Sequence, residues 1–261
     1  MKEIDFSWFY KQTKDKRTIS LLKRIESKEC LKQKFPLKIG KLKLWLGDNP
    51  SNSLKTFLQL FKEKDHNMIP NFLSKSDLTI IDLGANEGFY TLKAKELSPK
   101  SKIISVEPNP YAFRTLKSNV KSNRLKNVIT VNKAVTSKNG KITFEIVKGK
   151  STVGSTKVYE KYRIAYEIEK IRINSITLEC LCKKFKIDKI DLLKMDVEGS
   201  ELDILKSSEK ILSKVKKAII EYHRAQRTRR GVTNLMIKNN FKLLKVDDQK
   251  YYGDLYFIRN A

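Results

Sequence analysis

Glycine and glutamate residues in the first half of the chain have the spacing expected of a nucleoside-binding site. The apolar residues 78–83 are typical of a buried strand, and they end at a turn that runs from Gly84 to Gly88. A second apolar segment, residues 103–106, is followed by Glu107, 23 residues after Gly84. Glycine lets a ligand approach the backbone closely, and a carboxylate at the end of the next strand can accept hydrogen bonds from both ribose hydroxyls.

The turn also indicates which kind of nucleoside is bound. Its pattern is G-x-x-x-G, which lacks the G-x-G-x-x-G sequence that brings a dinucleotide pyrophosphate onto a helix N-terminus. Asp82 lies beside the turn, where its carboxylate would repel a pyrophosphate but attract the ammonium or sulfonium group of S-adenosylmethionine. The turn therefore favours a nucleoside without phosphates, and a dehydrogenase is the least favoured interpretation.

Two further strands are expected to bring titratable side chains to the same edge of the sheet. Residues 187–195 and 218–222 both predict buried strands, and the carboxyl ends of parallel strands form the ligand-binding edge. Asp196 and Glu198 point to the same side if the first of these strands continues through Val197. The titratable residues at these strand ends are Lys194, Asp196, Glu198, Glu221 and His223.

Four motifs in this order and spacing resemble one known family. They are D-L-G-A-N-E-G-F-Y-T from residue 82, V-E-P-N-P from residue 106, I-D-L-L-K-M-D-V-E-G-S-E from residue 190 and I-I-E-Y-H from residue 219. Together they resemble the FkbM family of S-adenosylmethionine-dependent methyltransferases over about residues 75–225, with a similar closing strand at 255–260. The K-x-D-x-E-G-x-E phrase is the specific part, whereas the glycine turn fits any class I methyltransferase.

The resemblance implies a fold and a division of the chain. The expected fold is α/β, a Rossmann-like class I methyltransferase fold with a seven-stranded, mostly parallel sheet and a terminal antiparallel hairpin. Residues 1–74 would form a small basic extension of helices and strands, and residues 75–261 the methyltransferase domain. The length of 261 residues suits one sizeable core with such an extension.

The resemblance also implies S-adenosylmethionine as the cofactor and positions for its parts. The methionine portion would lie among Asp82, Gly84, Ala85, Asn86, Gly88 and Tyr90, with Asp196 near the reacting end. Glu107 would bind the ribose, and Pro108, Asn109 and Ala134 would flank the adenine. The segment around Ala134 lacks the acidic residue that many class I methyltransferases place there, so main-chain contacts are expected to recognise adenine.

Methyl transfer to a hydroxyl group needs a side chain that receives the proton, and a carboxylate or histidine is suited to this. Asp196 is the first candidate, either as this base or as the residue that positions cofactor and acceptor. His223 is the second candidate, and Glu198 could contact substrate or stabilise the start of the following helix, as could Glu201. Lys194 is expected to orient Asp196 by an ion pair. No metal site is predicted, although Asp196, Glu198 and Glu221 could gather a divalent ion.

The charge of the chain is unusual, because 55 basic and 29 acidic residues leave a net charge of +26. Such an excess attracts polyanions such as nucleic acid, anionic glycans or an acidic membrane surface, but it could equally reflect genome composition or a hot habitat. The basic residues are densest in residues 1–45, with 13 basic against 5 acidic residues, and in residues 223–230, which are expected to form a loop.

The remaining composition excludes several protein classes. The chain has no stretch of eighteen apolar residues and no signal peptide, so a cytoplasmic protein is expected. Its three cysteines, Cys30, Cys180 and Cys182, predict neither a disulfide framework nor a zinc site. Cys182 is expected to pack in the core, on a helix with Leu178, Leu181 and Phe185.

Outside the motifs, patterning predicts the other elements. Residues 1–34 are expected to be helical, with aromatic anchors at residues 6–10, followed by strands around Gly40 and a helix over 53–61. Phe113, Leu116 and Val120 are expected to be buried on the helix before strand 128–131, and 142–147 is expected to be a core strand. Residues 149–173 predict an irregular, substrate-facing insertion that begins with a loop at 150–156. One helix is expected to contain Leu202, Leu205 and Leu212, and 241–246 with 254–258 to form the hairpin.

Three functions remain open from the sequence. The first is O-methylation of a sugar, glycan, lipid headgroup or small metabolite, which the resemblance implies. The second is methylation of tRNA or rRNA, which the charge permits and for which the basic extension could dock the RNA. The third is a binding module that keeps the fold without catalysis, against which the intact glycine turn and Glu107 argue. The sequence does not indicate an oligomeric state.

Overall fold

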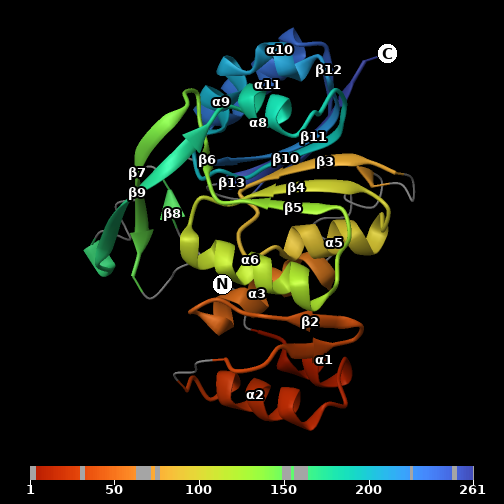
Figure 1. Ribbon diagram of the computed structural model, residues 1–261, viewed down its shortest axis with the longest axis vertical. Coiled ribbons are helices and arrows are strands. Elements are labelled where there is room, and N and C mark those ends of the chain that lie inside the picture. The colour runs from red at the N-terminus through yellow and green to blue at the C-terminus, as the bar shows by residue number, and fades with distance from the viewer. Residues whose placement is uncertain are drawn as a thin grey trace.

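The computed structural model describes residues 4–29, 33–62, 72–73, 77–148, 154–155, 164–223, 226–248 and 252–260. A central sheet lies between two layers of helices, and the N-terminal elements form a further layer beyond one of these (Figure 1). A second, smaller sheet lies at one side of the molecule (Figure 1).

The central sheet has seven strands in the order β12-β13-β11-β10-β3-β4-β5. These strands are β3 (Thr79–Leu83), β4 (Lys102–Val106), β5 (Val128–Val131), β10 (Ile190–Met195), β11 (Val215–His223), β12 (Phe241–Asp248) and β13 (Tyr252–Arg259). β13 pairs antiparallel with both β11 and β12, while the pairings among β11, β10, β3, β4 and β5 are parallel. The predicted seven-stranded, mostly parallel sheet with a terminal antiparallel hairpin is confirmed.

Apolar runs explain why the inner strands lie at the centre. In β3, β4 and β10 nearly every side chain is buried, as expected when helices cover both faces of a parallel sheet. One face is covered by α5 (Phe89–Leu97) and α6 (Pro110–Ser122), and the other by α8 (Leu178–Lys184), α9 (Glu201–Ser207), α10 (Glu209–Leu212) and α11 (Gln226–Lys238) (Figure 1). Cys182, on α8, is buried in the core as predicted, whereas Cys30 lies outside the described residues.

The second sheet corrects two expectations about the middle of the chain. Its order is β6-β9-β7-β8, formed by β6 (Ala134–Val135), β7 (Gly140–Val147), β8 (Gly154–Ser155) and β9 (Ile168–Ile176). The strand expected at 142–147 therefore does not belong to the central sheet, because it pairs with β9 as a long hairpin. Residues 168–173, expected to be irregular, form most of β9, and residues 154–155 of the expected loop form β8. The remainder of 149–163 lies outside the described residues.

The N-terminal elements share an apolar core with the central domain. They are α1 (Phe6–Lys11), α2 (Lys16–Glu26), β1 (Leu37–Ile39), β2 (Leu42–Leu44) and α3 (Pro50–Phe61), which agree with the predicted helices and strands. The aromatic residues predicted as anchors pack against α3 and α5. The ring centroid of Phe57 lies 6.1 Å from that of Phe9 and 5.6 Å from that of Phe89. The predicted boundary near residue 74 lies outside the described residues.

Polar contacts also tie the extension to the turn that follows β3. The Glu87 carboxylate is buried and accepts hydrogen bonds from Ser53 Oγ at 2.8 Å and from the Gly47 amide at 3.0 Å. The Asn119 side chain exchanges two hydrogen bonds with the backbone of Trp45. Burial raises the pKa of Glu87 to about 8. The extension is therefore fixed next to the glycine turn.

Three smaller expectations differ from the structure. The single helix expected to contain Leu202, Leu205 and Leu212 is two helices, α9 and α10, which meet at Ser208. Residues 226–230 of the expected basic loop form the start of α11. On α6, Leu116 is buried as predicted, but Phe113 and Val120 are only half-buried, because Asn119 occupies the inner face with its bonds to Trp45.

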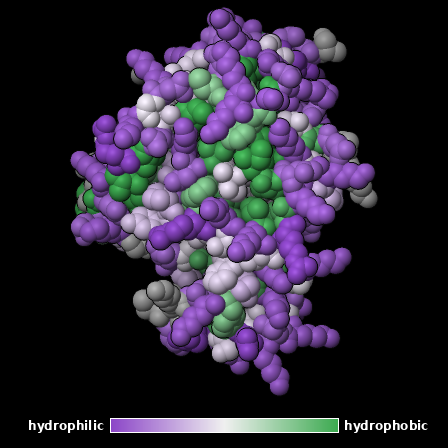
Figure 2. Space-filling model, in the orientation of Figure 1, coloured by the Kyte–Doolittle hydropathy of each residue, from purple (hydrophilic) through white to green (hydrophobic). Residues whose placement is uncertain are grey.

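The surface reflects the high net charge. Figure 2 shows hydrophilic side chains around the outline of the molecule, with apolar side chains gathered over its middle. Within the described part of the chain, no helix combines the length and the apolar character that crossing a bilayer requires.

Candidate active site

The glycine turn brings the ends of β3 and β10 into close contact. The amides of Gly84 and Ala85 both donate to the carbonyl of Val106 at the end of β4, at 2.9 and 3.0 Å. Gly84 has a φ of +75°, and a Cβ atom built on it would lie 1.7 Å from the backbone oxygen of Asp196. Only glycine fits this position, for both backbone conformation and space. The turn therefore holds Asp196 against the start of the predicted cofactor site.

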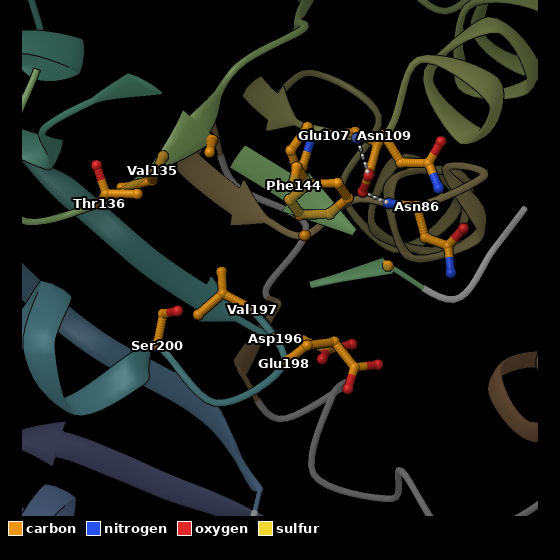
Figure 3. Close-up of a pocket in the computed structure, with 14 residues that line it drawn as sticks. Asn86, Glu107, Asn109, Val135, Thr136, Phe144, Asp196, Val197, Glu198 and Ser200 are labelled. Carbon is orange, nitrogen blue, oxygen red and sulfur yellow. Dashed lines mark hydrogen bonds between the residues drawn. The ribbon is translucent and has the colours of Figure 1, made fainter. Parts of the chain in front are cut away.

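Glu107 is fixed at the end of β4 by two backbone amides. Its Oε2 accepts from the Asn86 amide at 2.7 Å and its Oε1 from the Asn109 amide at 2.8 Å (Figure 3). The residue is only 6% exposed, and burial raises the pKa of its carboxyl group to about 7. Each oxygen keeps a lone pair, so the carboxylate can still receive two hydroxyl hydrogens from a ligand.

A narrow cavity opens in front of Glu107. Val135 and Phe144 supply apolar surface on one side, and the carboxylates of Asp196 and Glu198 lie on the other (Figure 3). Its lining consists of Gly84, Asn86, Glu107, Pro108, Asn109, Ala134, Val135, Thr136, Phe144, Gly154, Asp196, Val197, Glu198 and Ser200. A fixed diol acceptor beside apolar walls fits a nucleoside, and carboxylates at the far end fit a cationic group such as a sulfonium. These residues therefore suit S-adenosylmethionine.

Lys194 lies between the fully buried carboxylate of Asp82 on β3 and the half-buried carboxylate of Asp196 after β10. Its Nζ lies 3.7 Å from Asp82 and 3.4 Å from Asp196, and it donates to the carbonyl of Gly84 at 3.2 Å. Burial alone would lower the pKa of this amine, but Asp196 and Asp82 hold the pKa above its usual value. Burial would likewise raise the pKa of Asp196, yet Lys194 and His223 lower it. Lys194 thus keeps Asp196 ionised.

A second cavity lies on the other side of Asp196. It extends from α3 of the N-terminal extension to the ends of β10, β11 and β13. Its lining consists of Asn52, Ser53, Thr56, Gln59, Leu60, Gly84, Ala85, Asn86, Glu87, Phe89, Tyr90, Lys194, Asp196, Glu198, Ile219, Glu221, Tyr252 and Asp254. Four residues line both cavities, namely Gly84, Asn86, Asp196 and Glu198. These four form a shared wall, across which a group bound in one cavity can reach a group bound in the other.

His223 lies behind this wall, surrounded by carboxylates. Its Nδ1 is 3.1 Å from Glu201, and its Nε2 is 3.3 Å from Glu221 and 3.6 Å from Glu198. Burial alone would lower the pKa of the imidazole, but Glu201 and Glu221 raise it well above its usual value. The ring is therefore an imidazolium at neutral pH. It neutralises the carboxylates around it and, in this charged form, cannot itself receive a proton.

Glu221 is a carboxylate whose proton affinity suits a general base. Its burial, together with the nearby charge of Asp196, raises the pKa of its carboxyl group to about 8. A base works best when its pKa lies close to the working pH. Glu221 also lines the second cavity, so its position and its pKa both suit a proton acceptor there.

Three of these residues have the donor atoms of a cation site. One ligand atom each from Asp196, Glu221 and His223 lie within 4.8 Å of one another. Two carboxylates and an imidazole could hold a divalent metal if the imidazole lost its proton. The pairing of the imidazolium with the carboxylates supplies the same charge balance without a metal.

The structure brings most predicted site residues to the two cavities. Eight of them line the first cavity and three more, Ala85, Tyr90 and Lys194, line the second. Asp82 is fully buried beneath the turn and bonded to Thr91, so it reaches the site only through Lys194. Within the described residues, Gly88 and His223 also lie outside the linings of both cavities. Gly88 instead begins α5 with a φ of +85°.

Asp196 and Glu198 were expected to point to the same side if the strand over 187–195 continued through Val197. The strand does not continue that far. β10 ends at Met195, and Glu198 has a φ of +56°, so a turn rather than strand geometry directs its side chain. Glu201, considered as a substrate contact or as a helix-start charge, is fully buried and accepts from the amides of Val197 and Gly199 as well as contacting His223. It positions the imidazole.

Sequence reasoning missed residues that come from other parts of the chain. From β6, β7 and the residue after β6 these are Val135, Phe144 and Thr136; from α3 they are Asn52, Thr56 and Gln59; from β13 they are Tyr252 and Asp254. Gly154 of β8 lies in the segment 149–173 that was predicted to face the substrate. The position of Asp254 could have been predicted from the sequence. It begins the predicted strand 254–258, and this strand pairs with the strand that contains Glu221. The positions of the residues of α3 and β7 could not, because tertiary packing alone brings them to the site.

Comparison with known proteins finds methyltransferases among the relatives of this chain. The family model described as Methyltransferase FkbM domain matches residues 82–250. The "2-O-methyltransferase NoeI" of Sinorhizobium fredii is 25% identical over 227 residues, which cover 81% of this chain and 88% of that protein. The "Hexuronic acid methyltransferase AglP" of Haloferax volcanii is 29% identical over 151 residues, 58% of each chain. The "Methyltransferase sdnD" of Sordaria araneosa is 29% identical over 152 residues, 49% of this chain and 59% of that protein.

Proposed function

Because this chain belongs to the FkbM methyltransferase family, we propose that it transfers a methyl group from S-adenosylmethionine in the first cavity to a hydroxyl group of a sugar-containing acceptor in the second. The observation that carries the proposal is the wall that the two cavities share. A nucleoside held at Glu107 has its reactive end directed at Asp196 and Glu198, and those residues also face the second cavity. The relatives NoeI and AglP, which are named for the methylation of a 2-O position and of a hexuronic acid, support a sugar acceptor.

The proposed roles of the cofactor-binding residues follow from their positions. Glu107 receives the two ribose hydroxyls, with its carboxylate held by the amides of Asn86 and Asn109. Ala134, Val135 and Phe144 form the surface against the adenine. When bound, the cofactor supplies an electrophilic methyl group on a positively charged sulfur.

The remaining residues prepare the acceptor for an in-line displacement. Such a reaction depends on alignment and on a site that excludes water, so few catalytic groups are needed. Asp196, kept ionised by Lys194, aligns the methyl group on the sulfur with the acceptor oxygen, while the bond between that methyl group and the sulfur breaks. Glu221 receives the proton that the hydroxyl loses, and His223 balances the charge of Glu221 before the transfer.

A substitution at Asp196 tests this division of roles. In Asp196→Asn we expect S-adenosylmethionine affinity to fall less than tenfold while turnover falls by a factor of about 10²–10³, because a group that aligns the reacting atoms acts mainly in the transition state. Calorimetry measures the affinity, and transfer of a labelled methyl group to a panel of glycosides measures the turnover. Equal loss of both quantities would contradict the assignment.

RNA is the competing acceptor, because a net charge of +26 attracts polyanions. The same labelled assay with total RNA decides between the two. Salt-sensitive binding of RNA together with methyl incorporation into RNA, and none into glycosides, would replace the sugar acceptor.

A further inference from the structure

One wall of the second cavity comes from the N-terminal extension. Asn52, Thr56 and Gln59 of α3 line this wall. Their spacing of four and then three residues places them on one face of the helix, and the buried apolar residues of α3 lie on the other. The family model matches residues 82–250, so α3 lies outside the part of the chain that this model describes. The wall is therefore an addition of this chain to the site that the family model covers.

Packing and a hydrogen bond fix α3 against the glycine turn. The ring centroid of Phe57 on α3 lies 5.6 Å from that of Phe89 on α5. Ser53 Oγ, also on α3, donates to the buried carboxyl group of Glu87 at 2.8 Å, within the turn itself. Ser53 and Phe57 are both almost completely buried. The polar face of α3 therefore keeps a fixed position relative to the wall that the two cavities share.

Thr56 and Gln59 offer hydrogen bonds of complementary kinds. The hydroxyl of Thr56 donates to the carbonyl of Asn52 at 3.2 Å, so its oxygen is left to accept a hydrogen bond from a ligand. The amide of Gln59, on an exposed residue, has one carbonyl acceptor and two N–H donors. Both side chains are uncharged. A hydroxyl group, which donates and accepts at the same time, matches this pair.

The same cavity also provides apolar surface and has a limited size. Leu60, Ile219 and Tyr252 belong to its lining, and 43% of the surface of Tyr252 is exposed. The cavity volume of about 310 Å³ lies near the lower end of the range of about 300–1,000 Å³ that is typical of ligand sites. A sugar ring has apolar C–H groups on its faces and hydroxyl groups at its edge. This mixed lining therefore suits a sugar ring.

We propose that α3 is part of the acceptor-binding site, and that Thr56 and Gln59 hold a second hydroxyl of the sugar while a first one is methylated. This inference rests on the proposed methyl transfer and specifies which residues determine its acceptor. Asp196 and Glu221 face the reacting hydroxyl from the strand ends. α3 belongs to the described lining of the second cavity and not to that of the first, so it binds the acceptor without touching the cofactor.

Deoxy sugars test the contact directly. Methyl glucoside and its monodeoxy derivatives are assayed for transfer of the labelled methyl group at saturating S-adenosylmethionine. Among the derivatives that remain substrates of the wild type, we expect one to have a KM raised about three- to tenfold, the effect of one lost hydrogen bond. Thr56→Val should raise the KM for methyl glucoside by a similar factor, and removal of the same sugar hydroxyl should then have no further effect. The kcat and the Kd for S-adenosylmethionine should change by less than about twofold.

Two control variants separate the contact from a change of structure. Thr56→Ser keeps the hydroxyl group and should keep the KM of the wild type. Thr233→Val makes the same substitution at a half-buried position on α11, a helix outside the described linings of both cavities. The KM for methyl glucoside should be unchanged in this variant.

The other outcomes distinguish this inference from the proposed function. An unchanged KM in Thr56→Val, or equal KM values of the wild type for all the deoxy derivatives, would overturn the α3 site while leaving methyl transfer intact. A raised KM that keeps the full effect of the missing sugar hydroxyl would also overturn it, because the substitution would then act through the structure. If the protein binds S-adenosylmethionine but methylates no sugar, the proposed function fails, and this inference fails with it.

Discussion

Replacing Glu107 with alanine should abolish most of the affinity for S-adenosylmethionine. The carboxylate is the only predicted contact for the two ribose hydroxyls, and both of its oxygens are oriented by backbone amides at 2.7 and 2.8 Å. Hydrogen bonds to a charged group contribute roughly 1.5–3 kcal/mol each. Losing two of them costs about 3 kcal/mol or more, which corresponds to an increase in Kd of at least about 100-fold.

The assay is calorimetric titration at pH 8, where most of the Glu107 carboxyl groups are ionised because the pKa lies at about 7. Glu107→Gln keeps the size of the side chain and one acceptor oxygen, so its Kd should lie between those of the wild type and the alanine variant. Glu96→Ala is the matched control, since Glu96 lies on the outer surface of α5 and pairs with Lys93. A Kd of the alanine variant within threefold of the wild type would refute the ribose assignment.

Three further predictions follow from the buried acids and the turn. Turnover should rise with pH, reach half of its maximum near pH 8 and level off above about pH 9, because Glu221 must be ionised to receive a proton and its pKa is raised to about 8. A rate profile that keeps this pH dependence in Glu221→Gln would show that another group titrates. Glu87 has a folded-state pKa of about 8 against 4.5 when unfolded, so the folded state holds the extra proton and stability falls by about 1.4 kcal/mol per pH unit between these values. Denaturant unfolding measures this loss, which Glu87→Gln should remove; equal slopes in both proteins would contradict it. Gly84→Ala should lose cofactor binding, because its Cβ would clash with the Asp196 carbonyl, and calorimetry that finds normal affinity would show that the turn can move.

The central domain was predictable because its sequence signals are local and redundant. Short apolar runs specify buried parallel strands, and the predicted segments 78–83 and 103–106 coincide with β3 and β4. The position of Glu107 followed from strand order alone, since the ends of adjacent parallel strands meet. The same reasoning placed Asp196 and Glu221 at one edge.

The second sheet and the second cavity were not predictable in this way. The strand at 140–147 has an apolar pattern suited to either sheet, and only its pairing with β9 decides between them. Asn52, Thr56 and Gln59 lie on a helix whose apolar face was predicted, but nothing local indicates that its polar side borders the site. The turn at Glu198 depends on a positive φ in a residue other than glycine, which sequence patterns do not reveal.

The most direct test of the account is to locate the transferred methyl group. The protein is incubated with methyl glucoside and with S-adenosylmethionine that carries a ¹³C label on its methyl group, and the product is analysed by NMR. The two-cavity arrangement predicts a labelled methyl ether on a sugar oxygen, formed by the wild type and lost in Glu221→Gln. A label found on nitrogen or carbon, or an ether formed equally by both proteins, would contradict proton removal from a hydroxyl group by Glu221.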